Sequence, residues 1–259
     1  MKQVEFAERA KRILKEDKSV IGLAVAGSWL TIELDEFSDL DLILVTHDKI
    51  SEDKGKMLDI AGRLGELLSG FTGEHVGEPR VLICLYNNPL LHVDIKFVTL
   101  EEFHSRIETP KILLDTDGQL KNALSNSIGR FPYPDYQWIE DRFWIWIHYA
   151  LLKIGRGEYF EAIDFLGFLR MVVFGPLLLI KNNNLPRGVR KVETQLKEED
   201  ILALKSTLSV YQKQSLLESY RNSAALYRKL RISLFDNNIV LQSDTENEVM
   251  NYFDEIERK

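Results

Sequence analysis

Apolar and polar residues in the first half of the chain follow two different periods. Residues 4–16 and about 50–70 place apolar side chains at the three- and four-residue spacing of amphipathic helices. Shorter apolar runs indicate strands, and these are "VIGLAVAG", "LDLILVT", "RVLICLYN", "LLHVDIKFV" and "KILLDTDGQ". The turn residues "NNP" between the third and fourth runs predict a hairpin, and the fifth run is typical of an edge strand that ends in an Asp-Gly turn.

The pattern changes near "IGRFPYPDYQW", where a glycine and two prolines interrupt any regular element. Beyond this point the helical period dominates, over residues 135–155, 158–174, 176–182, 197–207 and 209–235. A last helix is predicted to begin at Ser243, because Ser243 and Glu246 have the spacing of a capping box. We therefore predict an α+β fold with two domains. Residues 1–130 would form a mixed sheet with flanking helices, and residues 131–259 a helical bundle.

Composition narrows the classes of partner. The chain has 259 residues, 45% of them hydrophobic, and a net charge of -7, which argues against a surface that neutralises nucleic-acid phosphates. The single cysteine, Cys84, lies in an apolar run and is expected to be a buried thiol. The longest apolar run, residues 171–180, is shorter than the roughly 20 residues of a membrane span, and the N-terminal segment has no signal-peptide pattern. These features predict a cytoplasmic protein without a membrane partner, and they argue against a polynucleotide partner without excluding one.

Candidate chemistry is concentrated in "AVAGSWLTIELDEFSDLDLILV". Side chains alternate along a strand, so Asp39 and Asp41 are expected on one face, where two carboxylates would repel each other without a cation. Magnesium prefers oxygen ligands and commonly takes one or two carboxylates together with substrate phosphates. Gly27 and Ser28 directly follow a strand, where glycine allows close approach of a ligand and serine offers donors to phosphate. Asp94 interrupts a further apolar strand that we expect nearby.

This pattern resembles the nucleotidyltransferase superfamily that includes DNA polymerase β, and is most similar to the aminoglycoside and lincosamide nucleotidyltransferases. Their signature is a strand that ends in Gly-Ser, a short helix, Asp-x-Asp on the next strand and a third carboxylate on a later strand. The resemblance implies that Asp39 and Asp41 hold magnesium on the triphosphate of ATP or another nucleotide. It implies that Asp94 ligates metal or deprotonates the acceptor hydroxyl, and that two magnesium ions take part.

The likeness continues into the second half. "DRFWIWIHYALLKIGRGEYFEA" is similar to the start of the helical domain of antibiotic adenylyltransferases, which implies that Lys153 and Arg156 reach the triphosphate or the acceptor. A helix C-terminus that carries cations is the plain alternative for these two residues. Tyr149 stands where some aminoglycoside enzymes carry a glutamate base, which moves the expected base to Asp94.

A second departure follows the Gly-Ser pair. Family members often have an arginine or a small residue and a second glycine there, whereas this chain has Trp29, Leu30 and Thr31. This difference would alter how the nucleotide is held.

The resemblance implies a magnesium-dependent transferase that moves a nucleoside monophosphate, AMP in the first instance, to a hydroxyl of a small molecule such as an antibiotic. Two alternatives stay open. One is a catalytically silent nucleotide-binding or interaction module, as in toxin-antitoxin systems. The other is an enzyme that modifies RNA or protein, for which a basic stretch would supply a groove: Lys181, Arg187, Arg190 and Lys191. The resemblance is also compatible with a homodimer.

Overall fold

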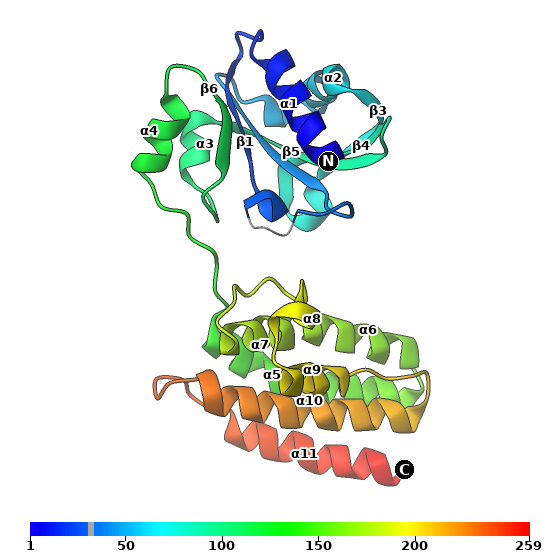
Figure 1. Cartoon of the computed structure of the whole chain (residues 1–259). Helices are drawn as coiled ribbons and strands as arrows, with labels where there is room; N and C mark the ends of the chain where they lie inside the picture. The colour runs from blue at the N-terminus through cyan, green and yellow to red at the C-terminus, as the bar shows by residue number, and fades with distance from the viewer. Residues whose placement is uncertain (31–33) are drawn as a thin grey trace. The chain divides into compact units, whose positions relative to one another are not determined.

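The computed structural model describes residues 1–30 and 34–259, which form two compact units, Met1–Phe131 and Pro132–Lys259 (Figure 1). The first unit contains a six-stranded sheet with helices, and the second consists of helices and loops. This arrangement confirms the α+β class that the sequence predicts.

The sheet of the first unit is mixed. Its strands are β1 (Val20–Val25), β2 (Leu40–Thr46), β3 (Glu66–Gly73), β4 (Glu78–Asn87), β5 (Leu91–Thr99) and β6 (Lys111–Asp115). Their order is β3-β4-β5-β2-β1-β6, with β2 and β5 parallel and every other neighbouring pair antiparallel. The β4–β5 hairpin and the edge position of β6 agree with the sequence prediction.

Helices cover the two faces of this sheet unequally. On one face, α1 (Lys2–Leu14) and α2 (Lys54–Leu64) pack against a large cluster that includes Leu42 of β2 and Ile95 of β5. On the other face, α3 (Leu100–His104) and α4 (Gln119–Ser125) form a smaller cluster with Val45 and Val98, near the carboxyl ends of the same strands. The amino-terminal ends of β2 and β5 present partly buried or exposed side chains on that second face, and they include two aspartates.

The predicted helix over about 50–70 is wrong in its second half. Helix α2 ends at Leu64, and β3 follows at once through Gly65. A Cβ atom on Gly65 would lie 2.9 Å from Nη2 of Arg9 and 3.2 Å from the ring of Tyr86, so the chain turns here in close contact with its neighbours. The spacing of the leucines in this stretch is compatible with a helix or with a strand, and the stretch forms a strand because it pairs with β4. The short helices α3, α4 and α8 (Val192–Gln195) were not predicted either.

The second unit contains the predicted helices. They are α5 (Tyr136–Arg156), α6 (Tyr159–Leu169), α7 (Gly175–Lys181), α9 (Glu198–Lys205), α10 (Lys213–Leu234) and α11 (Ser243–Arg258). Aromatic side chains fill their core, where the rings of Phe143 and Tyr227 stack with centroids 3.7 Å apart. Burial of such rings is a major source of stability in a bundle of this size.

Helices α6 and α7 are joined by a π-helical turn, η4 (Arg170–Phe174), into one helix over Tyr159–Lys181. This helix has 23 residues and contains an 18-residue apolar window with a mean hydropathy of 2.0, so by length and composition it could cross a membrane. The apolar stretch is thus longer than the sequence run of residues 171–180 indicated. Half of its apolar window is buried inside the unit, and Leu169, Val173 and Phe174 belong to the core. Packing in the core therefore accounts for half of this apolar window.

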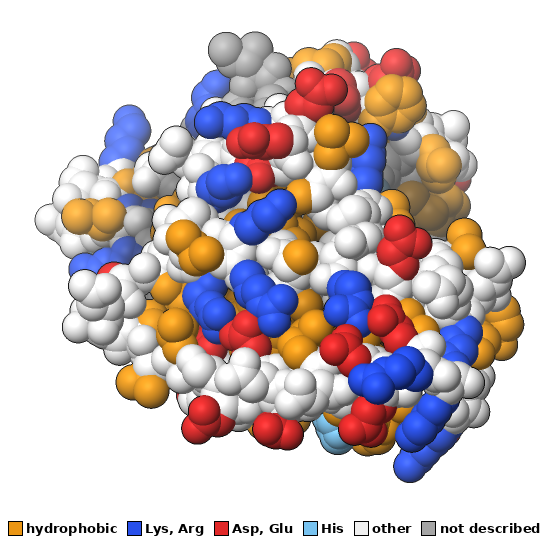
Figure 2. Space-filling model, turned by 90° about the horizontal axis from the view of Figure 1, so that it is seen from below, with side chains coloured by type: hydrophobic (Ala, Val, Ile, Leu, Met, Phe, Trp, Pro, Cys, Tyr) orange, Lys and Arg blue, Asp and Glu red, His pale blue; other side chains and the backbone are white. Residues whose placement is uncertain are grey.

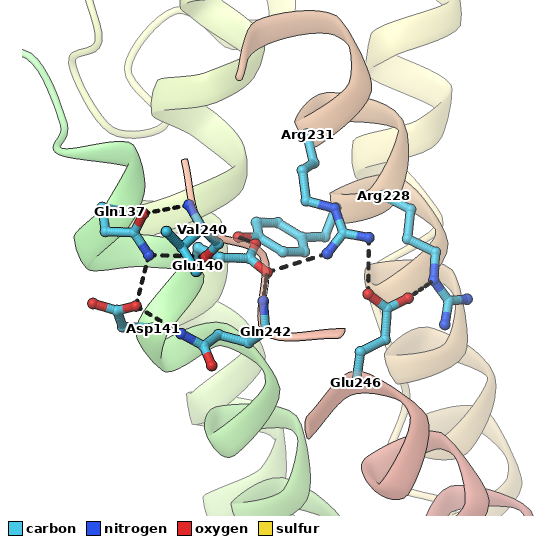
Figure 3. Close-up of polar contacts among 9 residues, drawn as sticks. Gln137, Glu140, Asp141, Arg228, Arg231, Val240, Gln242 and Glu246 are labelled. Carbon is cyan, nitrogen blue, oxygen red and sulfur yellow. Dashed lines mark hydrogen bonds and ion pairs between the residues drawn. The ribbon is translucent and has the colours of Figure 1, made fainter. Parts of the chain in front are cut away.

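A buried glutamate links three of these helical segments (Figure 3). Glu140 of α5 is fully buried, and its carboxylate accepts hydrogen bonds from the Tyr227 hydroxyl at 2.6 Å and from the backbone N–H of Gln242 at 2.9 Å. The Arg231 guanidinium lies 3.2 Å from the same carboxylate. Burial and the bond to Glu140 raise the pKa of Tyr227, so its hydroxyl remains a donor. A buried carboxylate is tolerated here because these three donors satisfy it.

Glu246 at the start of α11 extends this network. It contacts Arg228 at 2.6 Å and Arg231 at 2.8 Å, both on α10. The predicted capping box is therefore wrong: the N-cap of α11 is Gln242, and no side chain caps it. Glu246 binds two arginines of a neighbouring helix instead.

Candidate active site

Asp41 and Asp94 are direct partners in the parallel register of β2 and β5. Neighbouring strands lie roughly 4.8 Å apart and register partners point to the same face, so the two carboxylates occupy one place on the sheet. Both residues are partly buried, at the end of that face which α3 and α4 leave uncovered. The expectation that Asp94 lies beside the first motif therefore agrees with the strand order.

Asp39 is placed differently. It precedes the first residue of β2 and is only partly buried. Among the residues that the structure describes, no group of three or more histidine, cysteine or acidic side chains is arranged to hold a metal ion. The structure thus pairs Asp41 with Asp94 and does not bring Asp39 into a three-carboxylate cluster.

Gly27 lies against the Asp41 carboxylate. It opens a 3-10 turn, η1 (Gly27–Leu30), directly after β1, and has a φ of +62°, in the left-handed region that favours glycine. A Cβ atom at this position would lie 2.0 Å from Oδ2 of Asp41. Ser28 belongs to the same turn, Trp29 packs against the main core of the sheet, and Thr31 lies outside the described residues.

Glu108 is a member of this site that the sequence analysis missed. Its Oε1 accepts a hydrogen bond of 2.9 Å from the backbone N–H of Gly27. Glu108 lies in the segment before β6, and β6 pairs with β1 so that Lys111 is opposite Val25. The sequence predicted β6 as an edge strand but did not identify β1 as its partner. Knowledge of that pairing would have placed Glu108 near Gly27.

His92 was also missed. Its Nε2 lies 2.8 Å from Oδ1 of Asp94, and its side chain is 51% exposed. The alternation in "LHVDIKF" already places these two side chains on one face, which is the signal that could have found the pair.

Lys96, the next residue on that face of β5, has a different partner. Its Nζ lies 2.8 Å from Glu78 of β4. The Arg80 guanidinium and the Lys96 ammonium together hold the pKa of the Glu78 carboxyl at about 2. This face of β5 therefore carries three polar residues at alternate positions: His92 contacts Asp94, and Lys96 contacts Glu78.

The paired carboxylates fit a divalent cation by the chemistry of their donors. Carboxylate oxygens are the ligands that magnesium prefers, and two of them with substrate phosphates make a common magnesium site in proteins. The absence of a side chain at Gly27 keeps the backbone of the turn close to Asp41. Asp41 and Asp94 are therefore the residues that would hold such an ion, with Asp39 as the remaining candidate from the sequence.

In the second unit, Lys153 is held by acidic neighbours. Its Nζ lies 2.9 Å from Glu158 and 3.0 Å from Glu161, and these contacts raise the pKa of Lys153. The Tyr149 hydroxyl also hydrogen-bonds to Glu161. Arg156 is 65% exposed and lies 3.9 Å from Glu158. The cations that the sequence analysis assigned to the triphosphate thus have carboxylate partners within their own unit.

One residue of the predicted basic stretch, Lys181, also has an acidic partner. Lys181 lies 2.6 Å from Asp200, which is buried and also accepts a hydrogen bond from Asn182. Lys181 therefore ties the end of α7 to α9. On the face of the molecule in Figure 2, Lys and Arg side chains alternate with Asp and Glu, as on an ordinary solvated surface.

Comparisons with known proteins find similarity among solved structures only. No protein-family model matches the chain, and no curated protein sequence matches it. An aminoglycoside 6-adenyltransferase from Bacillus subtilis is 18% identical, with a TM-score of 0.42 over 100% of this chain and 98% of that chain. A spectinomycin adenyltransferase from Enterococcus faecialis, solved with ATP and spectinomycin, is 13% identical, with a TM-score of 0.31 over 99% of each chain.

A nucleotidyltransferase-like protein from Exiguobacterium sibiricum is also similar, at 12% identity and a TM-score of 0.37 over 88% of this chain and 76% of that chain. All three names agree with the family that the sequence motif resembles. All three TM-scores are below 0.5.

Proposed function

We propose that this protein transfers a nucleoside monophosphate, AMP from ATP, to a hydroxyl group of a small molecule. The observation that carries the proposal is the parallel register of Asp41 and Asp94, with the Gly27 turn in contact with Asp41. Paired carboxylates beside a glycine turn are suited to a magnesium-bound triphosphate. The net charge of -7 favours a small acceptor over a polynucleotide, and we place the reaction in the cytoplasm.

In the proposed reaction, the acceptor oxygen attacks the α-phosphorus of ATP. The bond between the α-phosphorus and the bridging oxygen breaks, pyrophosphate leaves, and the hydroxyl proton passes to Asp94. Magnesium, when bound, would neutralise charge on the leaving pyrophosphate. The protein's own contribution is mainly to position the reactants and to stabilise charge, as is usual for phosphoryl-type transfer. Gly27 and Ser28 are the candidates for contact with the phosphates, and Lys153 and Arg156 stay candidates from the second unit.

The test is pyrophosphate release with each of the four nucleoside triphosphates. Each reaction contains magnesium and one member of a panel of hydroxylated small molecules, including aminoglycosides and lincosamides. We expect release with the wild-type protein and none with Asp41→Asn. Asp59→Asn is the matched control, since Asp59 is exposed on α2 and outside the proposed site. Equal release by wild type and Asp41→Asn would contradict the proposal.

One observation favours a second candidate, a nucleotide-binding module without turnover. The part of the chain that the structure describes contains no three-ligand metal cluster, and Lys153 is paired with two glutamates. This candidate predicts that ATP binds and that no acceptor in the panel yields pyrophosphate. Binding and turnover measured on the same protein therefore separate the two functions.

A further inference from the structure

His92 and Asp94 contact each other on one face of β5. Nε2 of His92 lies 2.8 Å from Oδ1 of Asp94, well within hydrogen-bonding distance. An ionised carboxylate has only acceptor oxygens, so with Asp94 ionised this bond requires the tautomer of His92 that has its proton on Nε2. The bond engages one oxygen of Asp94 and so restricts rotation of its carboxylate about the Cβ–Cγ bond.

The surroundings of His92 link this bond to the proposed site. The parallel register of β2 and β5 begins with Leu40 opposite Val93, so Asp39 and His92 are the residues immediately before this first pair. On its other side, His92 is opposite Leu85 of β4, an apolar neighbour. Among the described residues, the polar partner of His92 is Asp94.

We propose that His92 is a positioning residue that orients the Asp94 carboxylate toward the reaction centre shared with Asp41. The inference rests on the proposed function, because orientation of Asp94 matters only if Asp94 ligates a cation or accepts the proton of the hydroxyl. Both roles require one particular orientation of the carboxylate. Outer residues that hydrogen-bond to metal-ligating groups commonly affect metal affinity or activity by about 10- to 100-fold.

The test compares three variants with the wild-type full chain. His92→Leu removes the donor, and His92→Gln keeps an N–H donor near the position of Nε2. Lys96→Met is the matched control, because Lys96 lies two residues after Asp94 on the same face and contacts Glu78 instead. The readouts are Mn²⁺ affinity without nucleotide, measured by electron paramagnetic resonance, the kcat and KM of pyrophosphate release, and the melting temperature.

We expect His92→Leu to weaken Mn²⁺ binding and to lower kcat, each by about 10-fold or more. KM for the acceptor and the melting temperature should stay near their wild-type values, since the histidine side chain is half exposed. His92→Gln should restore most of the loss, and Lys96→Met should bind Mn²⁺ as the wild type does. A merely structural role would lower the melting temperature and would leave Mn²⁺ affinity unchanged.

The outcomes separate this inference from the proposed function. Wild-type Mn²⁺ affinity in His92→Leu overturns the inference alone. If His92→Gln weakens Mn²⁺ binding as much as His92→Leu does, the inference is also overturned, because the hydrogen bond would then not be the cause. Mn²⁺ binding that depends on His92, without pyrophosphate release by the wild type, supports the inference and contradicts the transfer reaction. A wild-type protein that neither binds Mn²⁺ nor releases pyrophosphate contradicts both.

Discussion

At the scale of single residues, Gly27 is the position where the site tolerates least change. Its φ lies in the left-handed region, and a Cβ atom there would stand 2.0 Å from the Asp41 carboxylate. We expect Gly27→Ala to displace that carboxylate and to weaken magnesium-dependent ATP binding by about 10-fold or more, equivalent to about 1.4 kcal/mol. Isothermal titration of ATP into the variant measures this loss.

Gly77 supplies the control for this change. It has a φ of +77°, and a Cβ atom there would meet nothing within 4 Å. Gly77→Ala therefore imposes a similar backbone strain of about 1–2 kcal/mol without a clash. Unchanged ATP binding in Gly27→Ala, or an equal loss in both variants, would show that contact with Asp41 does not matter.

Cys84 supports the core and takes no part in the chemistry. Its side chain is buried in the main cluster of the sheet, and burial raises the pKa of its thiol to about 12. Because the thiolate is the reactive form, we expect native protein to react with a thiol reagent such as DTNB far more slowly than protein unfolded in guanidinium. Rapid labelling of the native protein would place Cys84 at an accessible surface and contradict the fold of β4.

At the scale of elements, Glu78 of β4 pairs with Lys96 of β5 and with Arg80 of its own strand, and the first of these ion pairs joins β4 to β5. Their attraction lowers the pKa of the carboxyl from 4.5 to about 2, so the ionised form stabilises the folded state. This contribution is complete above the unfolded pKa of 4.5 and is lost as pH falls from 4.5 toward 2. Glu78→Gln should therefore lower the free energy of unfolding at pH 7 and have little effect near pH 2.

Chemical denaturation of both proteins over this pH range measures the difference. Glu248→Gln, at an exposed position of α11, should show no such pH dependence. A difference between wild type and Glu78→Gln that grows as pH falls would reverse the expected sign.

The helices of the second unit depend on Glu140. Removing one partner of a buried charged network leaves the others unsatisfied, which costs about 3–5 kcal/mol. We expect Glu140→Ala to lower the free energy of unfolding by about that amount, through the lost bonds to Tyr227, Arg231 and Gln242. Asp141→Ala, at the exposed neighbouring position, should cost less than about 1 kcal/mol. Similar costs for the two variants would contradict the role of the network.

Elements were predictable where their periodicity was unambiguous. The apolar run of β2 and the long amphipathic stretches of α5 and α10 allow a single interpretation, and the structure agrees. The start of β3 was not predictable, because its leucines fit a helix until pairing with β4 decides otherwise. Glu246 shows the same limit: its spacing from Ser243 indicates a local cap, and two arginines on another helix bind it instead.

At the scale of the whole molecule, the site depends on contacts between segments far apart in the sequence. The pairing of Asp41 with Asp94 could be anticipated, because both interrupt apolar strands and the family pattern joins those strands. Glu108 carries no motif, and its place beside Gly27 follows only from the pairing of β6 with β1. The contact of His92 with Asp94 needs no strand order, because the two side chains alternate onto one face of β5. The roles assigned to the site residues are predictions, and among them Lys153 is bound to two glutamates of its own unit.

The central claim is that Asp41 and Asp94 form a magnesium-dependent triphosphate site. Its most direct test is isothermal titration of ATP, with and without magnesium, into the wild-type protein, Asp41→Asn and Asp94→Asn. We predict binding that requires magnesium and that either substitution weakens by about 10-fold or more, equivalent to about 1.4 kcal/mol. Affinity that is the same with and without magnesium, or that both variants retain in full, would contradict the account.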